Sequence, residues 1–412
     1  MSCGNLVRRT VGLLAVLCCL APVPGMAQVD PYSIVFENGD SANRVDMIFA
    51  GDGYQESELG SAYVTHVNGT LNHFFSNNAP FTRYQSFFNA YRVNIISNES
   101  GADDPNAGTY VDTALDASYN WGGTDRCLYF NTSKANAAVN AALSGTGIDV
   151  DMRLGTVNST KYGGCGGQWG VYAGGHSAAN EIAIHEIGHS FGGLADEYFY
   201  TDDVYSGGEF SQWNVTNSPN SGKWDRWVGY DDPDTNIGVI GYYEGGRYFA
   251  EGVWRPSDNS KMRALNRPFD AISREKFIYE IYEEVDPLDA WIDTGLTYNE
   301  GDQLWVDRVD DDVISLEWSV DGQVVAYNGS QLDLASLGLN AGSYTVSVMA
   351  YDNLLDHSFS GDSLDWWRLD GDWLSQNLSW TVQISAVPEP GAAGVLAAWA
   401  LMGVMRRRRA LG

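Results

Sequence analysis

The chain has 412 residues, and its 53 Asp and Glu residues outnumber its 24 Lys and Arg residues, which gives a net charge of −29 at pH 7. Such a charge repels nucleic acid and anionic membrane surfaces, so we expect no nucleic acid partner. About 360 residues remain between two terminal segments of distinct character, which is more than a single hydrophobic core usually serves.

The first 27 residues have the pattern of a secretory signal peptide. Arg8 and Arg9 form a basic start, an apolar run covers 11–20, and small residues precede a plausible cleavage site after Ala27. The apolar run is short for a membrane span, which argues against an uncleaved anchor. We therefore expect residues 1–27 to be removed and the remainder of the chain to be exported.

Between residues 28 and 286, apolar runs typical of buried strands alternate with helical patterns. The predicted elements are a strand over 44–50, a helix over about 56–75, a strand over 91–96, a helix over 135–143 and a strand over 152–157. Strand, helix and strand in succession predict a parallel pair of strands joined by a crossover helix. A glycine-rich run follows at 162–167.

Two cysteines, Cys127 and Cys165, remain once the signal peptide is removed. An oxidising exterior favours a disulfide between them over two buried thiols. Such a bond would contribute about 2–4 kcal/mol to the stability of the protein.

The most informative stretch is HEIGHSFGGLADEY at residues 185–198. His185 and His189 stand four apart, so they share one face of a helix for which Ser177 is the expected N-cap. Two neutral imidazoles at this spacing can bind one Zn²⁺, and Glu186 lies beside them to act on a metal-bound water. The alternative is a helix with two structural histidines, which the glycine turn and the paired carboxylates after the motif make less favourable.

The third metal ligand is expected after the end of this helix. Glycines at 192 and 193 can turn the chain back, because glycine accepts a positive φ. Asp196 follows the turn and is the expected ligand, with Glu197 as the competing carboxylate and Glu244 as a more distant one. The unused member of the pair at 196 and 197 is expected to orient a histidine.

These parts predict hydrolysis of a peptide bond. The metal would lower the pKa of its bound water, and Glu186 would take the proton and pass it to the leaving amine. Tyr198, Tyr243, His176 and Arg255 are candidate donors to the developing oxyanion, and the sequence does not choose among them.

Acidic clusters at 103–104, 231–234 and 310–312 are places where calcium could bind. None of them matches a complete calcium-binding loop, so solvated surface is the favoured interpretation.

The character of the chain changes near Asp286, after which short alternating strands dominate. The predicted strands cover 313–320, 343–351 and 378–384. Asp321-Gly322 is a hairpin turn signal between two of the strands. Because alternation of apolar and polar residues is typical of a half-buried antiparallel sheet, residues 287–386 predict an immunoglobulin-like β-sandwich.

The last segment begins with Val387-Pro388-Glu389-Pro390, continues with an apolar stretch and ends in arginines at 406–409 before a short tail. Positive residues after an apolar segment hold the chain end on the cytoplasmic side. Residues 387–412 resemble a PEP-CTERM sorting signal, which implies transient membrane anchoring and processing by an exosortase-type enzyme. Loss of both ends removes six of the 24 Lys and Arg and one of the 53 Asp and Glu, which leaves a net charge near −34.

Stretches outside the metal motif carry a family resemblance. They are NRVDMIFAGDGY at 43–54, FNAYRVNIISNESGADDP at 88–105, YGG at 162–164, EGG at 244–246 and RPSDNSKMR at 255–263. With the motif, they resemble the immunoglobulin A peptidase family of zinc metallopeptidases. The resemblance implies an endopeptidase whose zinc is held by His185, His189 and a carboxylate, with Glu186 as the base. It also implies that Met262 packs beneath the metal as a Met-turn.

The expected fold is therefore an α/β zincin catalytic domain over 28–286, followed by an all-β immunoglobulin-like sandwich over 287–386. The expected function is that of an exported zinc endopeptidase that cleaves protein or peptide substrates at the cell surface or outside the cell. The alternative is a catalytically silent surface adhesion protein. Such a protein would usually have lost Glu186 or a histidine of the motif, and all three are present.

Overall fold

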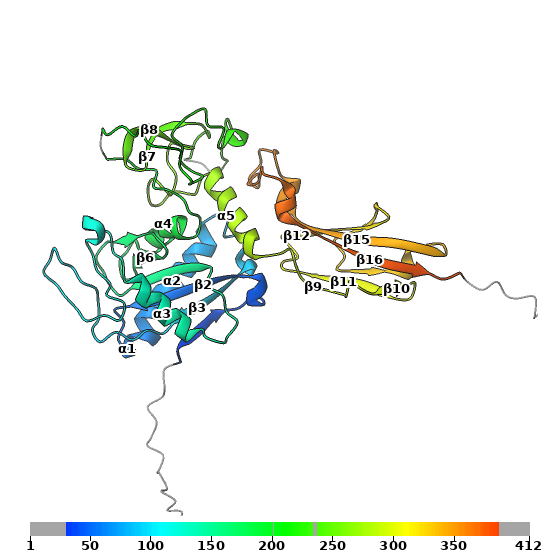
Figure 1. The fold of residues 1–412 in the computed structure, drawn as a ribbon, viewed down its shortest axis with the longest axis horizontal. Coiled ribbons are helices and arrows are strands. Elements are labelled where there is room, and N and C mark those ends of the chain that lie inside the picture. Colours follow the sequence, from blue (N-terminus) through cyan, green and yellow to red (C-terminus); the bar gives the residue numbers. More distant parts are fainter. Residues whose placement is uncertain (1–29, 201, 234–236, 387–412) are drawn as a thin grey trace, which may run out of the picture. The chain divides into compact units, whose positions relative to one another are not determined.

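A six-stranded sheet organises the first half of the chain in the computed structural model, which describes residues 30–200, 202–233 and 237–386 (Figure 1). Its strands are β1 (Tyr32–Phe36), β2 (Val45–Asp52), β3 (Phe88–Val93), β4 (Met152–Val157), β5 (Gly164–Cys165) and β6 (Gly170–Ala173). Their spatial order is β1-β3-β2-β4-β6-β5, in which the four inner strands run parallel and both edge strands run antiparallel. The predicted parallel pair is thus confirmed as β2 with β3.

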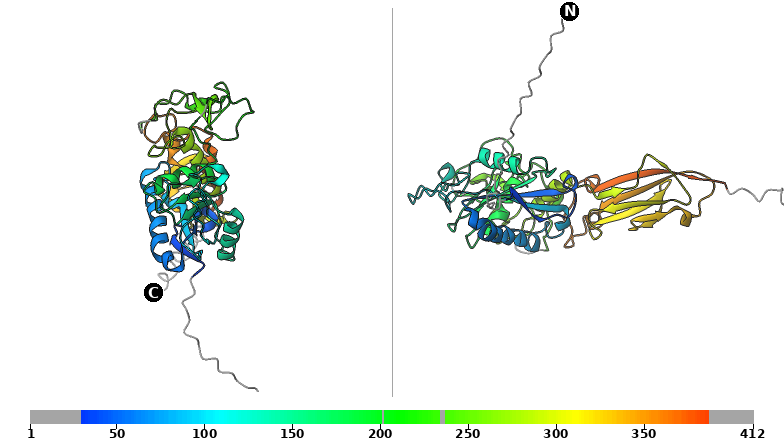
Figure 2. Two further views of the ribbon diagram at one scale, coloured as in Figure 1. Left: turned by 90° about the vertical axis from the view of Figure 1, so that its left-hand side faces the viewer. Right: turned by 90° about the horizontal axis from the view of Figure 1, so that it is seen from below.

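Helices cover both faces of this sheet (Figures 1 and 2). The helical elements are α1 (Glu56–Glu58), a π-helical segment (Leu59–Tyr63), α2 (Val64–Asn77), α3 (Thr132–Ala142) and α4 (Ala179–Ser190). On one face, α3 shares an apolar cluster with Ile48 and Val171 of the sheet. On the other face, Thr70 of α2 donates a hydrogen bond to the hydroxyl of Tyr172. Because both faces are covered, every residue of β2 is buried, which explains its nearly continuous apolar sequence.

The start of α4 differs from the sequence prediction. Ser177 does not cap the helix, because Ala178 occupies the N-cap position and makes no side-chain capping bond. His176 satisfies the first turn instead. Its Nδ1 accepts from the backbone N–H of Ala178, and its carbonyl oxygen accepts from that of Ala179, each over 3.0 Å. His176, and not Ser177, therefore accepts the hydrogen bonds from the first backbone N–H groups of α4.

The chain between α4 and α5 (Ala271–Glu284) is largely irregular and contains one hairpin, formed by β7 (Tyr243–Gly246) and β8 (Phe249–Arg255). Asp270 begins α5 by accepting a hydrogen bond from the backbone N–H of Ser273. Tryptophans at 224 and 227 pack with the first turn of α5 in a separate apolar cluster.

Two further sheets follow α5. Their strands are β9 (Leu288–Trp291), β10 (Thr297–Asn299), β11 (Gln303–Arg308), β12 (Ile314–Val320), β13 (Gln323–Tyr327), β14 (Gln331–Asp333), β15 (Gly342–Asp352) and β16 (Ser375–Ile384). One sheet has the order β10-β16-β15-β12-β13 and the other the order β14-β11-β9. The pairs are antiparallel as predicted, except that β10 runs parallel to β16. Asp321 and Gly322 both have positive φ, so the predicted hairpin turn is confirmed.

A buried carboxylate joins the β-rich region to the helices and loops before it. Asp352, at the end of β15, is fully buried and accepts hydrogen bonds from Arg83 Nη2, Tyr84 Oη and Tyr282 Oη over 2.6–2.8 Å. A buried charge is stable only when it is paired and hydrogen-bonded in this way. Contacts of this kind place the described residues from Pro31 onward in one compact unit.

Two predictions about cellular location fall on the chain ends. The predicted signal peptide at 1–27 and the sorting segment at 387–412 lie outside the described residues. Within the described ranges, no helix has the length and apolar character needed to cross a membrane.

Candidate metal centre and active site

His185 and His189 lie on the face of α4 that lines a cavity of about 550 Å³, whereas Ile184 on the opposite face is fully buried. The Nδ1 of His185 lies 2.9 Å from the carbonyl oxygen of Lys261, and the Nδ1 of His189 lies 2.8 Å from that of Leu194. A carbonyl oxygen only accepts hydrogen bonds, so each Nδ1 carries a proton. Each Nε2 is therefore left to present a lone pair to the cavity.

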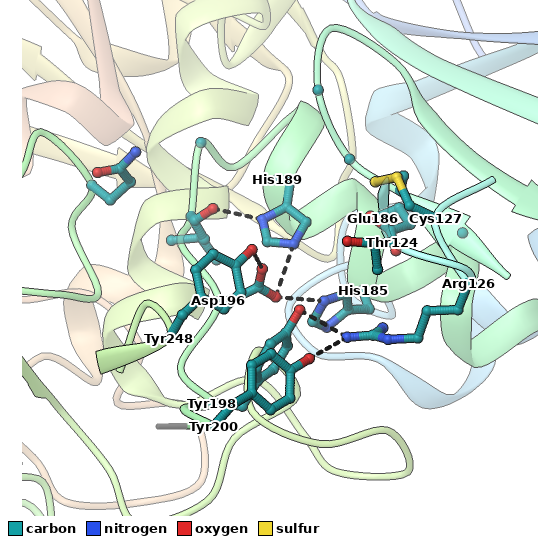
Figure 3. A pocket seen from close by; sticks show the side chains of 17 residues that line it. Thr124, Arg126, Cys127, His185, Glu186, His189, Asp196, Tyr198, Tyr200 and Tyr248 are labelled. Atoms are coloured by element: carbon teal, nitrogen blue, oxygen red, sulfur yellow. Dashed lines mark hydrogen bonds and ion pairs between the residues drawn. A yellow bond between two sulfur atoms is a disulfide. The ribbon is translucent and has the colours of Figure 1, made fainter. Parts of the chain in front are cut away.

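Asp196 completes a three-residue set with these histidines. Its Oδ1 lies 3.1 Å from the Nε2 of His185 and 3.3 Å from the Nε2 of His189 (Figure 3). In the described part of the chain, these residues form the one group of three or more His, Cys, Asp or Glu side chains that could hold a metal ion, with ligand atoms within 4.8 Å of one another. Two lone pairs that face a carboxylate oxygen repel it unless a positive charge lies between them. The donor set therefore fits a divalent cation.

The turn after α4 brings Asp196 back beneath the helix. Gly193 adopts a φ of +58°, and the backbone N–H of Leu194 donates to the carbonyl oxygen of Gly188 over 2.8 Å. The predicted glycine turn is thus confirmed. The hydroxyl of Tyr248 donates a hydrogen bond to Oδ2 of Asp196, which leaves Oδ1 to face the two imidazoles.

The electrostatics of the set are those of a site prepared for a cation. Burial alone would raise the pKa of Asp196, but the two imidazoles hold it well below its usual range. Burial alone would lower the pKa of His189, but its hydrogen bond and charge interaction with Asp196 raise it to about 9. Asp196 is therefore ionised, and without a metal ion a proton on Nε2 of His189 supplies the positive charge that it attracts. A divalent cation would take the place of that proton and leave the lone pair of Nε2 as its ligand.

Glu186 lies beside the histidines with only 6% of its surface exposed. It lines both the main cavity and a neighbouring cavity of about 390 Å³. Burial raises the pKa of its carboxyl, and the charges of His185, His189 and Arg126 partly oppose this shift. A buried carboxylate with a raised pKa is suited to accept a proton and to return it.

Glu197, the competing ligand, faces away from the cavity. It is fully buried and accepts hydrogen bonds from Asn214 Nδ2 over 2.9 Å and from Ser260 Oγ over 2.6 Å. The prediction that this carboxylate orients a histidine directly is wrong. It holds the turn at Ser260 instead, and the next residue, Lys261, supplies the carbonyl oxygen that fixes the ring of His185.

Met262 lies under α4, where the resemblance places a Met-turn. The side chain is fully buried, and a Cβ added at Gly188 would come within 2.3 Å of its Sδ. The glycine is therefore what allows the sulfur to approach the helix between the two histidines. The carbonyl oxygen of Met262 also accepts a hydrogen bond from the backbone N–H of Glu197 over 2.9 Å. This bond joins the turn at Met262 to the loop after α4 that carries Asp196.

Of the four predicted oxyanion donors, Tyr198 alone lines the main cavity. The hydroxyl of Tyr243 donates to a backbone carbonyl, His176 accepts at the start of α4, and Arg255 donates to the carbonyl oxygen of Glu244. The carboxylate of Glu244 accepts from a backbone N–H in its own hairpin. The distant ligand candidate is thus engaged elsewhere.

The cavity residues that were not identified from the sequence include Arg126, Tyr200 and Tyr248 (Figure 3). Arg247 and Tyr248 form the two-residue loop between β7 and β8, with φ of +47° and +74°. Loops of this type normally contain Asn or Gly, so Arg247 and Tyr248 are not recognisable as a turn from their residue types. Left-handed backbone at a tyrosine is uncommon, and it is a signal of functional constraint that only a structure reveals.

The predicted disulfide between Cys127 and Cys165 is present. It ties the loop that carries Arg126 to β5, at the edge of the sheet nearest α4. Gly166, which directly follows β5, lies against α4. A Cβ added at Gly166 would come within 2.5 Å of the Cβ of His189. The glycine-rich run thus forms a wall of the cavity that only glycine allows.

Among the described residues, no acidic cluster brings three metal-ligating side chains together, and Asp234 lies outside the described residues. Asp104 pairs with Lys161 over 2.9 Å. Asp232 was expected on solvated surface, and this prediction is wrong. It is 5% exposed and pairs with the buried guanidinium of Arg274 over 2.5 Å.

Two imidazoles and a carboxylate that converge beside a buried glutamate, in a mixed α/β fold, are the features of a hydrolase with a place for a metal ion. A family model described as IgA Peptidase M64 matches residues 34–238, which include the whole motif on α4 and Asp196. The chain belongs to this family and is a peptidase. No curated protein matches the sequence.

Proposed function

We propose that the protein is an exported, zinc-dependent endopeptidase in which Glu186 acts as the general base. The observation that carries this proposal is the convergence of Asp196 Oδ1 with the two Nε2 atoms of His185 and His189. Two imidazoles and one carboxylate are a common catalytic ligand set for zinc and leave a position open for water or substrate. A zinc ion held there would supply Lewis acidity to the water and to the scissile carbonyl.

The protein side chains have separate roles in this proposal. Glu186 accepts a proton at its carboxylate during attack on the carbonyl carbon and returns it to the leaving nitrogen. Tyr198, in the cavity wall, is the candidate donor to the developing oxyanion. Tyr248 orients Asp196 through its hydroxyl.

An internal cleavage site is supported by the cavities around Glu186. The main cavity and its neighbour share Glu186, His185 and Gly164 in their walls, so space continues on both sides of the proposed reaction centre. A polypeptide that passes through such a space can extend beyond the scissile bond in both directions.

The proposal extends to domain organisation and location. We propose that residues 28–286 form a zincin-type domain and residues 287–386 an immunoglobulin-like sandwich, a division supported by the end of α5 at Glu284 and the start of β9 at Leu288. Export to the cell surface or beyond is supported by the pattern of residues 1–27 and by the disulfide. Transient membrane anchoring and exosortase-type processing rest on residues 387–412.

The test compares hydrolysis of a peptide library by the wild type, Glu186→Ala and Glu186→Gln, with and without a chelator and with zinc restored. The wild type should cleave, lose activity on chelation and recover it with zinc. Both variants should keep the far-UV circular dichroism spectrum and one zinc ion per chain, with activity at least 100-fold lower. Hydrolysis that survives either substitution would refute the role of Glu186.

The matched control for metal binding is Asp196→Asn. This variant should keep its fold and bind zinc far more weakly, because the amide oxygen carries no charge. Zinc content equal to that of the wild type would contradict the proposed ligand set.

A further inference from the structure

Arg126 is a cation at the centre of the substrate-binding space. It lines both the main cavity and its neighbour, and the residue as a whole is exposed to solvent. The protein around it is strongly acidic. In spite of this, no carboxylate oxygen of residues 30–200, 202–233 and 237–386 lies within 4.0 Å of its guanidinium. An arginine without a carboxylate partner in such a protein requires an explanation.

The guanidinium is held in place by phenols rather than by an ion pair. Its Nη2 donates to the hydroxyls of Tyr198 over 3.2 Å and Tyr200 over 2.5 Å (Figure 3). Its Cζ also lies 5.6 Å from the ring centroid of Tyr198. Phenol hydroxyls fix the direction of the side chain without neutralising its charge. The Nε–H and both hydrogens of Nη1 make no hydrogen bond to any residue that the structure describes, so three of the five guanidinium donors are available.

The backbone at Arg126 is fixed independently. Its carbonyl oxygen accepts from the backbone N–H of Gly164 over 3.2 Å, and the next residue, Cys127, is bonded to Cys165. Both links join this loop to β5. A charged group held in one place before the substrate arrives loses little entropy when it binds, so the interaction retains more of its strength.

The other arginine in these cavities is occupied. Arg263 lines the neighbouring cavity, but its Nη1 lies 3.3 Å from Asp258 Oδ1 and also donates to the Asp258 carbonyl oxygen. Arg126 is thus the cation in these walls whose charge is not satisfied by a described carboxylate. A guanidinium N–H that keeps its charge makes a strong, charge-assisted hydrogen bond to a carboxylate.

We propose that Arg126 binds a carboxylate of the peptide substrate and thereby gives the enzyme a preference for acidic peptides. This inference rests on the proposed peptidase function of the same site. The carboxylate belongs either to an Asp or Glu side chain near the scissile bond or to the C-terminus of the peptide. The shared chemistry is a carboxylate that accepts charge-assisted hydrogen bonds from the guanidinium donors that Tyr198 and Tyr200 leave free.

The experiment uses the zinc-loaded, full-length exported protein and four synthetic peptide pools. All pools are acetylated and are otherwise built from uncharged residues. They differ only in a central Glu or Gln and in a free or amidated C-terminus. The wild type is compared with Arg126→Met and Arg126→Lys. Lys134→Met is the matched control, because Lys134 lies on α3, outside both cavities, and its loss changes the net charge equally.

The expected result is a preference of about tenfold or more in kcat/KM for one carboxylate-bearing pool, carried mainly by KM. Arg126→Met should abolish this preference, so that the preferred pool loses about tenfold more in kcat/KM than the Gln, amidated pool, whose own loss measures the changed surroundings of Tyr198 and Glu186. Arg126→Lys should keep part of the preference, and Lys134→Met all of it. Preference for central Glu identifies a side-chain carboxylate, and preference for the free C-terminus identifies the terminal one. Equal losses on all four pools, or a preference that survives Arg126→Met, would overturn the inference.

A binding measurement separates this inference from the proposed function. Fluorescence anisotropy of the same pools, labelled, is recorded with Glu186→Gln and with Glu186→Gln/Arg126→Met. If the wild type hydrolyses nothing but the carboxylate-dependent difference in binding is lost with Arg126, the proposed catalysis fails and the carboxylate site stands. If hydrolysis occurs and all pools bind equally, the proposed catalysis stands and the carboxylate site at Arg126 fails.

Discussion

Removal of the Cys127–Cys165 disulfide tests how the cavity wall is stabilised. The two cysteines are 38 residues apart, and closing a loop of this length removes chain entropy equivalent to about 4 kcal/mol from the unfolded state. Replacement of both by alanine should therefore lower the free energy of unfolding by about 2–4 kcal/mol. Cys127 is buried, so the alanine side chain there makes few new contacts that could offset this loss. Guanidinium-induced unfolding, followed by tryptophan fluorescence without reductant, measures the difference.

The control for this prediction is the wild type under reducing conditions. It should unfold with a free energy close to that of the double alanine variant, since both lack the same crosslink. The double variant should also lose part of its preference for acidic peptides, because Arg126 precedes Cys127. A loss of stability below about 1 kcal/mol would refute the reasoning. It would mean that the unfolded chain is already restricted at this loop without the disulfide.

Three further predictions concern the metal set and Asp151, whose Oδ2 accepts from the backbone N–H of Asp46 over 2.8 Å. Tyr248→Phe should weaken zinc affinity about tenfold in a chelator competition, because the hydroxyl that orients Asp196 is lost; unchanged affinity would contradict that role. Gly166→Ala should also reduce zinc affinity, because the added Cβ would displace His189, and a crystal structure with an unmoved ring would contradict this. Burial and neighbouring carboxylates raise the pKa of Asp151 from its ordinary value of 3.8 to about 7. Its ionisation therefore destabilises the fold increasingly as the pH rises from about 3.8 to about 7, and the full cost is present above that range. Asp151→Asn should therefore raise the free energy of unfolding by about 1–2 kcal/mol at pH 8 and leave it unchanged at pH 4, measured with urea at both pH values.

Features set by local sequence were predictable. The spacing of His185 and His189 places them on one face of any helix, and the glycine turn was visible because few other residues accept a positive φ. The buried strand over 44–50 was recognisable because a strand covered on both faces is mostly apolar, as β2 is apart from Asp46 and Asp52. These predictions needed no knowledge of distant residues.

The sequence left choices open where two adjacent groups competed for one role. Asp196 and Glu197 are neighbours, and their side chains point in different directions, one toward the histidines and the other toward Ser260. Sequence adjacency alone cannot tell which of them reaches the metal position. The cap at Ser177 failed for a similar reason, since His176 accepts the same backbone donors. Each choice was made by tertiary packing.

Arg126 and Tyr248 were beyond sequence reasoning, because they reach the cavity from loops far from the motif. Arg126 is held through its links to β5, whereas the position of Tyr248 depends on backbone contacts to the loop that carries Asp196. Arg247 donates its backbone N–H to the carbonyl oxygen of Asp196 over 2.8 Å, and Tyr248 donates its own to that of Tyr198 over 2.9 Å. Left-handed backbone at both hairpin residues costs on the order of 1–3 kcal/mol each, so these contacts must outweigh that cost. The hairpin and the ligand loop therefore act as one structural unit. A substitution in the β7–β8 loop should reach the metal through Asp196, whereas one in the disulfide-bonded loop should reach the substrate through Arg126.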